Sequence, residues 1–103
     1  MKISVERKSP TASDPASECL LQTPKWDFNW QRGYDYDGAI DALPGLVAGD
    51  VLTFRCTYDN SLQNPFVKQA LMQQMLSAPK DVTLGESTLD EMCLGALNVI
   101  YKN

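Results

Sequence analysis

The sequence predicts a mainly β protein, an antiparallel jelly-roll-like β-sandwich with one short helix near residues 65–76. Three observations favour this fold class. Apolar and polar residues alternate in several short segments, as they do in half-buried strands. A single segment has the apolar spacing of an amphipathic helix. The expected strands do not alternate with helices, so the βαβ units of a parallel sheet are not predicted.

The first strand is predicted at the beginning of the chain. Over residues 2–7, Ile3 and Val5 share one face and the residues between them are polar or charged, which indicates a half-buried strand. Residues 8–17 are rich in Ser, Pro, Thr and Ala and predict a turn or loop. Residues 18–23 are interpreted as the strand that returns beside the first.

An aromatic segment follows at 24–31. Large aromatic side chains recur at every second position, with Asp27 and Asn29 between them. This spacing predicts an extended segment with one aromatic face. Such a face packs into a core or forms a platform on which sugars stack, and core packing is the commoner role. The aromatic residues concerned are Trp26, Phe28 and Trp30.

The clearest strand is predicted at 51–58, after a loop at 41–50 that contains Pro and Gly. The residues that share its apolar face are Leu52, Phe54, Cys56 and Tyr58. Turn-forming residues end this strand. Asn64 and Pro65 then suit the N-cap and the first position of a helix. Helix formers continue to about residue 76, and the helix is expected to end before Pro79.

The last part of the chain combines a polar segment with a closing strand. Residues 81–91 are predicted to form a loop or a short strand, and residues 92–101 a strand with apolar residues on both faces. Three of the four acidic residues in the polar segment are considered as calcium ligands, but they lack the spacing of a calcium loop, so a solvated loop is the preferred interpretation. These residues are Glu86, Asp90 and Glu91.

The composition excludes several classes of function. The chain has 103 residues, a formal net charge of -4 and no His, and this length fits one domain. The negative charge argues against nucleic acid or an anionic membrane surface as a partner, and no apolar run is long enough for a membrane span. Without His, these residues alone form no Ser-His-Asp or Cys-His pair, so no catalytic residue is predicted.

The three cysteines leave two interpretations open. Cys19, Cys56 and Cys93 show no Cys-x-x-Cys spacing, which disfavours a zinc knuckle or a thioredoxin-type motif. Cys56 and Cys93 lie in predicted strands, where they either form a disulfide or remain separate buried thiols. Met92 precedes Cys93 and therefore faces the opposite side of a regular strand. The usual role of such a methionine is core packing.

Four segments in order carry a family resemblance. They are Trp26–Gln31, Gly49–Cys56, Tyr58–Ser61 followed by Asn64-Pro65, and Gly85–Cys93, which ends in Asp-Glu-Met-Cys. Together they resemble the C-terminal catalytic domain of the copper type II, ascorbate-dependent monooxygenases, the family of peptidylglycine alpha-hydroxylating and dopamine beta-monooxygenases. The match covers most of the chain, and two of the segments look closer to bacterial relatives than to the animal enzymes.

The resemblance implies a metal ligand and a disulfide. In the family, the Met of Asp-Glu-Met-Cys is a thioether ligand of the oxygen-activating copper, and it corresponds to Met92. The following Cys pairs with the Cys of the upstream strand, here Cys93 with Cys56. A soft sulfur ligand suits Cu(I). The implied activity is hydroxylation of a C–H bond with dioxygen and a reductant such as ascorbate. The implied disulfide favours an extracytoplasmic location, periplasmic or secreted.

The chain departs from the family at the imidazole ligands. The same copper needs two His of a His-x-His motif, and this sequence has none. We therefore expect residues 1–103 to be a single partial domain without its first strands, whose missing N-terminal part carries those ligands. Alone, the chain is expected to be inactive and to bind copper unstably. The small-molecule substrate is not readable. The alternative is a non-catalytic secreted β-sandwich with a binding or structural role.

Overall fold

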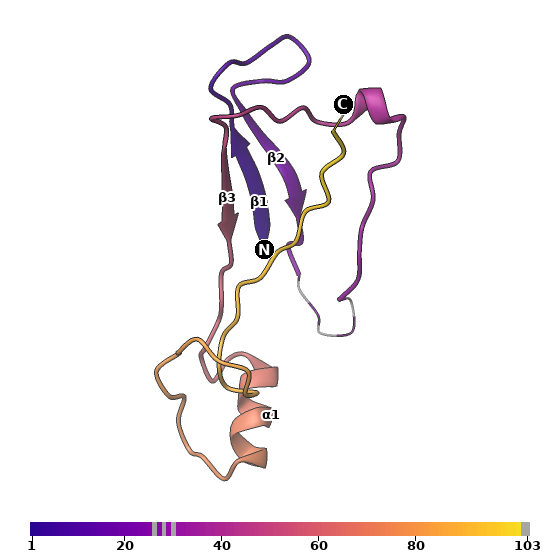
Figure 1. The fold of residues 1–103 in the computed structure, drawn as a ribbon. Coiled ribbons are helices and arrows are strands. Elements are labelled where there is room, and N and C mark those ends of the chain that lie inside the picture. The colour runs from indigo at the N-terminus through magenta and orange to yellow at the C-terminus, as the bar shows by residue number, and fades with distance from the viewer. Residues whose placement is uncertain (26, 28, 30, 102–103) are drawn as a thin grey trace. The chain divides into compact units, whose positions relative to one another are not determined.

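The computed structural model describes residues 1–25, 27, 29 and 31–101. Its regular elements (Figure 1) are strands β1 (Lys2–Glu6), β2 (Ser17–Gln22) and β3 (Val51–Arg55), the 3-10 helix η2 (Ile40–Ala42) and helix α1 (Pro65–Gln73). The chain divides into two compact units, Met1–Cys56 with Gly95–Asn103, and Thr57–Leu94. The first unit holds the three strands and the second holds α1. The predicted aromatic face of Trp26, Phe28 and Trp30 lies outside the described residues.

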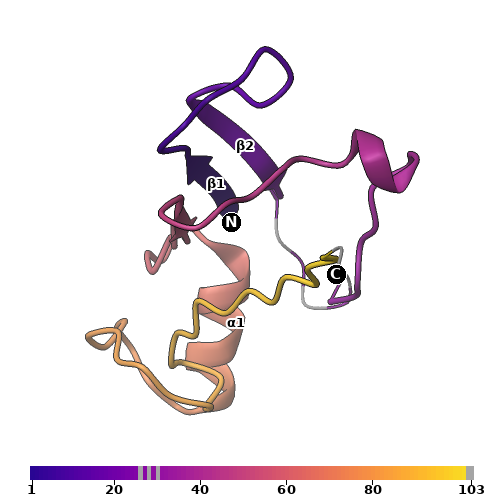
Figure 2. The same ribbon diagram turned by 45° about the horizontal axis from the view of Figure 1, so that its top comes forward.

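The first unit is built on a three-stranded antiparallel sheet in the order β2-β1-β3, seen from two directions in Figures 1 and 2. In the central strand β1, Ile3 lies opposite Leu21 of β2 and Phe54 of β3. Val5 lies opposite Leu52 on the same face. Ile3 and Val5 are buried. The predicted alternation is confirmed in β1 and in β3 as far as Arg55, because a period of two places their apolar residues on one face. The predicted strand at 51–58 is shorter than expected, so its last residues, 56–58, lie outside β3.

A bulge in β2 determines which of its side chains lie on each face of the sheet. Ile3 pairs with Leu21 and the next residue of β1, Ser4, pairs with Cys19, so the register skips Leu20. One extra residue in a strand is a β-bulge. In a regular strand Cys19 and Leu21 would share a face. The bulge instead places Leu21 on the apolar face and Cys19 on the polar face.

The hairpin between β1 and β2 is organised around the buried guanidinium of Arg7, whose side chain is 2% exposed. Nη2 donates to Glu18 Oε2 at 2.7 Å and lies 3.5 Å from Asp14 Oδ1. Nε donates to the carbonyl of Gly45 at 3.0 Å, and Nη1 to that of Pro15 at 2.8 Å. A buried charge is tolerated only with such partners. Arg7 therefore ties β2, the hairpin loop and the segment before β3 together.

The predicted strand at 92–101 is wrong, because none of its described residues belongs to a strand. The segment instead passes over the apolar face of the sheet. A side chain at Gly95 would collide with the ring of Phe54 and approach Ile3 Cδ1. A period-two pattern identifies a strand when its apolar residues lie on one face. In this segment the apolar residues would lie on both faces, so the pattern does not distinguish a strand from an irregular segment. The contact with the sheet is made by close packing rather than by a hydrogen-bonded ladder.

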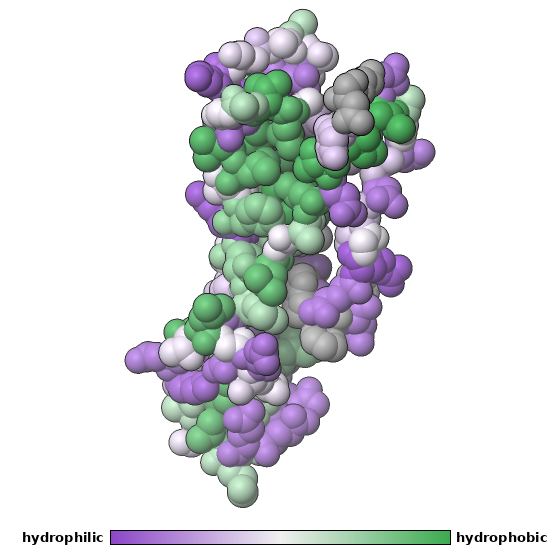
Figure 3. Space-filling model, in the orientation of Figure 1, coloured by the Kyte–Doolittle hydropathy of each residue, from purple (hydrophilic) through white to green (hydrophobic). Residues whose placement is uncertain are grey.

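The apolar face of the sheet is covered incompletely. Leu52 and Phe54 keep 37% and 38% of their surface exposed, and Figure 3 shows apolar side chains gathered over the sheet. The described residues form one antiparallel sheet and one α-helix, which confirms a mainly antiparallel β protein with a short helix. The second layer of the predicted sandwich is not among these described residues.

Helix α1 in the second unit begins as predicted. The side-chain oxygen of Asn64 accepts a hydrogen bond from the backbone N–H of Phe66 at 3.1 Å, which is the role of an N-cap. Pro65 occupies the first position of the helix, where its missing N–H costs nothing. Leu71 is the buried residue of this helix.

Helix α1 ends in a Schellman motif. The N–H of Leu76 donates to the carbonyl of Leu71 at 2.9 Å, and the N–H of Met75 donates to that of Met72 at 3.1 Å. This pattern requires a left-handed residue just after the helix, usually Gly. Met75 holds that position with a φ of 54°.

Replacing Met75 by Gly is expected to stabilise the protein by about 0.5–1 kcal/mol. A left-handed conformation costs an L-residue roughly 1–2 kcal/mol, part of which the greater freedom of unfolded glycine offsets. Met75 is 94% exposed, so little packing is lost. Urea denaturation measures the change. As a control, Met72→Gly, inside the helix, should destabilise by about 1 kcal/mol, and effects of the same sign would contradict this account.

Candidate functional site

The disulfide that the family resemblance implies is present. Cys56, directly after β3, and Cys93 are disulfide-bonded, whereas Cys19 is free and exposed. Between the two half-cystines the chain forms nearly all of the second compact unit, Thr57–Leu94. The bond therefore closes the segment that contains α1 and the polar loop before Met92.

The Gly-Asp pair before β3 has a structural role. Gly49 has a φ of 100°, a conformation that favours glycine. Asp50 Oδ1 accepts the N–H of Lys8 at 2.9 Å, and Oδ2 accepts that of Val47 at 2.9 Å. These two backbone hydrogen bonds hold the pKa of Asp50 below its usual value, and the bond from Val47 has the larger effect. The Asp50 carboxylate thus fixes the entry into β3, on the strand that leads to Cys56.

The loop before Met92 is organised by the carboxylate of Asp90. Its Oδ1 accepts from Lys80 Nζ at 3.0 Å, and its Oδ2 from the N–H of Ser87 at 3.2 Å. A side chain at Gly85 would collide with this carboxylate. Lys80 and then Ser87 hold the pKa of Asp90 below its usual value. Gly85 and Asp90 of the family-like motif are therefore needed to build the loop.

Acidification is expected to open this loop. The lowered pKa of Asp90 means that its ionised form supports the folded loop fully above the usual value of 3.8. This support is lost as the pH falls through the lower folded pKa. The N–H resonance of Ser87, followed by NMR, should titrate with Asp90, and Asp90→Asn should abolish that titration. Asp81→Asn, at an exposed neighbouring position, should leave it unchanged; an unchanged titration in Asp90→Asn would contradict the assignment.

Met92 follows this loop and precedes the disulfide. The backbone N–H of Glu91 donates to the carbonyl of Thr83 at 3.0 Å, and partial burial raises the pKa of Glu91. Met92 is 50% exposed. Among the described residues, no group of three or more Cys, Asp and Glu side chains forms a metal-binding cluster.

The Tyr58–Ser61 segment also proves to be structural. Asp59 Oδ1 accepts the N–H of Ser61 at 3.1 Å, and Asn60 Nδ2 donates to the carbonyl of Lys80 at 2.9 Å. Asn64 Nδ2 donates to the carbonyl of Asp59 at 2.8 Å. These bonds connect the start of α1 to the loop that leads to Met92. The local pattern signalled turn chemistry here, but not these longer connections.

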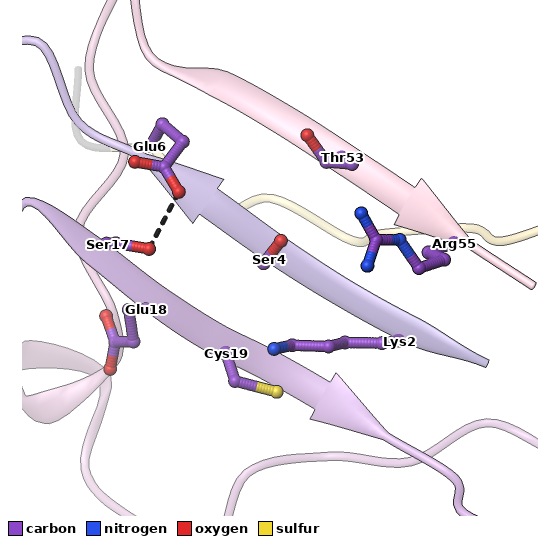
Figure 4. A pocket seen from close by; sticks show the side chains of 8 residues that line it. All are labelled: Lys2, Ser4, Glu6, Ser17, Glu18, Cys19, Thr53 and Arg55. Atoms are coloured by element: carbon purple, nitrogen blue, oxygen red, sulfur yellow. Dashed lines mark hydrogen bonds between the residues drawn. The ribbon is translucent and has the colours of Figure 1, made fainter.

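The sequence did not predict a hollow that lies on the polar face of the sheet. It has a volume of about 350 Å³, and Figure 4 shows side chains from all three strands around it. Cys19 opens onto it near the ammonium end of Lys2, and Arg55 lies on the other side of β1. The lining residues are Lys2, Ser4, Glu6, Ser17, Glu18, Cys19, Thr53 and Arg55.

Tyr36 lies beside the outer edge of β2. Its hydroxyl donates to the carbonyl of Leu20, the residue that the bulge leaves out of the register. Partial burial, followed by the charges of Glu18 and Cys19, raises the pKa of Tyr36. A hydroxyl that stays protonated keeps this donor in place. No local pattern in the sequence indicated this contact.

Comparisons of the chain with protein-family models, with curated proteins and with solved structures found no match. In the described part of the chain, no helix has the length and apolar character needed to cross a membrane.

Proposed function

We propose that this chain is part of a copper-dependent monooxygenase, that Met92 supplies one thioether ligand to copper, and that the Cys56–Cys93 disulfide braces that ligand. The proposal is carried by one observation: the half-exposed Met92 lies directly beside the disulfide that the resemblance implies. The network around Asp90 supports it further, because it holds the preceding loop in place.

The 103 residues do not fit a complete copper site. They offer one thioether and no imidazole, and a single soft ligand leaves copper without a working geometry. The proposal therefore places the two His ligands in sequence outside these residues and treats the sheet as part of a β-sandwich. The disulfide favours an extracytoplasmic location for the whole protein, because such bonds persist in oxidising compartments.

Copper titration tests this proposal on the protein that includes the residues encoded ahead of Met1. We expect an upstream His-x-His motif and tight Cu(I) binding, measured anaerobically against a chromophoric chelator. Met92→Ala should weaken Cu(I) binding at least tenfold, because one of few ligands is lost. Met72→Ala is the matched control, since Met72 is also exposed but lies in α1, and should leave the affinity unchanged.

The opposite results favour the alternative function. An in-frame extension without His-x-His, or a protein whose Cu(I) affinity is the same with and without Met92, would remove the copper proposal. The chain would then be interpreted as a non-catalytic secreted β-sandwich with a binding or structural role.

A further inference from the structure

Two positive charges lie opposite each other on the polar face of the sheet. Lys2 of β1 pairs with Arg55 of β3. Among the described residues, neither side chain has a carboxylate partner. Like charges directly opposite each other destabilise a sheet. Two adjacent positive charges are unexpected in a chain whose acidic residues outnumber its basic ones, with a formal net charge of -4.

Two hydroxyl groups form the next cross-strand pair. Ser4 lies opposite Thr53, and both line the same hollow as the two cations. Figure 4 shows the guanidinium of Arg55 pointing toward Ser4, and the ammonium of Lys2 extending along the face on the other side of Ser4, near Cys19. A guanidinium, an ammonium and two hydroxyls are all hydrogen-bond donors, and together they suit an oxyanion.

The two carboxylates that line the hollow already have partners. Glu6 Oε1 accepts from the hydroxyl of Ser17 at 2.7 Å, and Glu18 pairs with the buried Arg7. Glu6 also lies four residues along β1 from Lys2, roughly 13 Å at the usual strand rise. The end of the hollow between Lys2 and Arg55 is therefore positive.

We propose that Lys2, Arg55, Ser4 and Thr53 form a binding site for a small molecule that carries a carboxylate or a phosphate. The planar guanidinium of Arg55 binds two oxygens of such a group, and Lys2 adds a point charge. A bound anion also relieves the repulsion between the two cations. The site lies on the opposite face of the sheet from Ile3 and Val5, and it does not depend on the copper proposal.

NMR titration of the 103-residue chain tests this site. The amide resonances of Ser4 and Thr53 are followed during separate additions of inorganic phosphate and acetate, at constant ionic strength set with sodium chloride. We expect saturable shifts with at least one of these anions, and the stronger one identifies the oxyanion class. Arg55→Gln and Lys2→Gln should each raise the Kd at least fivefold. Lys68→Gln removes an exposed charge on α1 and should leave the Kd unchanged.

Thermal stability gives a second measurement of anion binding, which remains usable if either Arg55→Gln or Lys2→Gln folds poorly. The preferred anion should raise the Tm of the wild type, and this rise should shrink in whichever of Arg55→Gln and Lys2→Gln remains folded. Shifts that never saturate with either anion, or a loss of affinity in Lys68→Gln as large as in Arg55→Gln, would show general charge screening and overturn the site.

Discussion

Removal of the Cys56–Cys93 disulfide is expected to lower the free energy of unfolding by about 4 kcal/mol. The bond closes a loop of about 37 residues, and the loss of loop-closure entropy in the unfolded chain gives this magnitude. Small domains are stable by roughly 5–15 kcal/mol in total. The double variant should therefore be close to unfolding at 37 °C.

Urea denaturation of the Cys56→Ala/Cys93→Ala double variant measures this loss. Cys19→Ala is the matched control, because Cys19 is free, and it should change the free energy by less than about 0.5 kcal/mol. In the double variant, amide hydrogen exchange should accelerate more in α1 than in β1, because the disulfide closes the segment that contains the helix. A loss below about 1 kcal/mol would contradict the entropic role.

The elements with short-range signals could be predicted from the sequence. The alternation around Ile3 and Val5 identified β1, because a half-buried strand needs a period of two. The Asn64-Pro65 pair identified the start of α1, because an N-cap acts within one helical turn. The end of α1 was less clear, since the Schellman motif places Met75 where glycine is expected.

The remaining features depend on contacts that a local pattern does not contain. The hollow needs the register between β1 and β3, which places Lys2 opposite Arg55. The placement of Cys19 on the polar face needs the bulge at Leu20. Likewise, Gly95 packs against Phe54 without forming a strand. For the candidate copper site, spacing alone left the disulfide open, and only the family resemblance assigned a role to Met92.

Replacement of Arg7 by Met is expected to destabilise the protein by about 3 kcal/mol. In the sequence Arg7 directly follows β1, between the charged residues Glu6 and Lys8, and nothing local distinguishes it from exposed Lys8. Its guanidinium makes charged hydrogen bonds to two carbonyls and to Glu18, each worth roughly 1.5–3 kcal/mol at most. The side chains of Asp14 and Glu18 are 28% and 31% exposed. Water can therefore replace part of the interaction that these carboxylates lose when the guanidinium is removed. This moderates the 3–5 kcal/mol typical of a broken buried pair.

Urea denaturation of matched variants separates charge from geometry at this position. Arg7→Lys keeps the charge but not the planar fork, so it should recover only part of the loss. Lys8→Met, at the exposed neighbouring position, should change stability by less than about 0.5 kcal/mol. A double-mutant cycle with Glu18→Gln should give a coupling energy of about 1–2 kcal/mol. Coupling near zero would mean that Arg7 acts through the carbonyls of Gly45 and Pro15, and equal losses in Arg7→Met and Lys8→Met would mean that its burial contributes nothing.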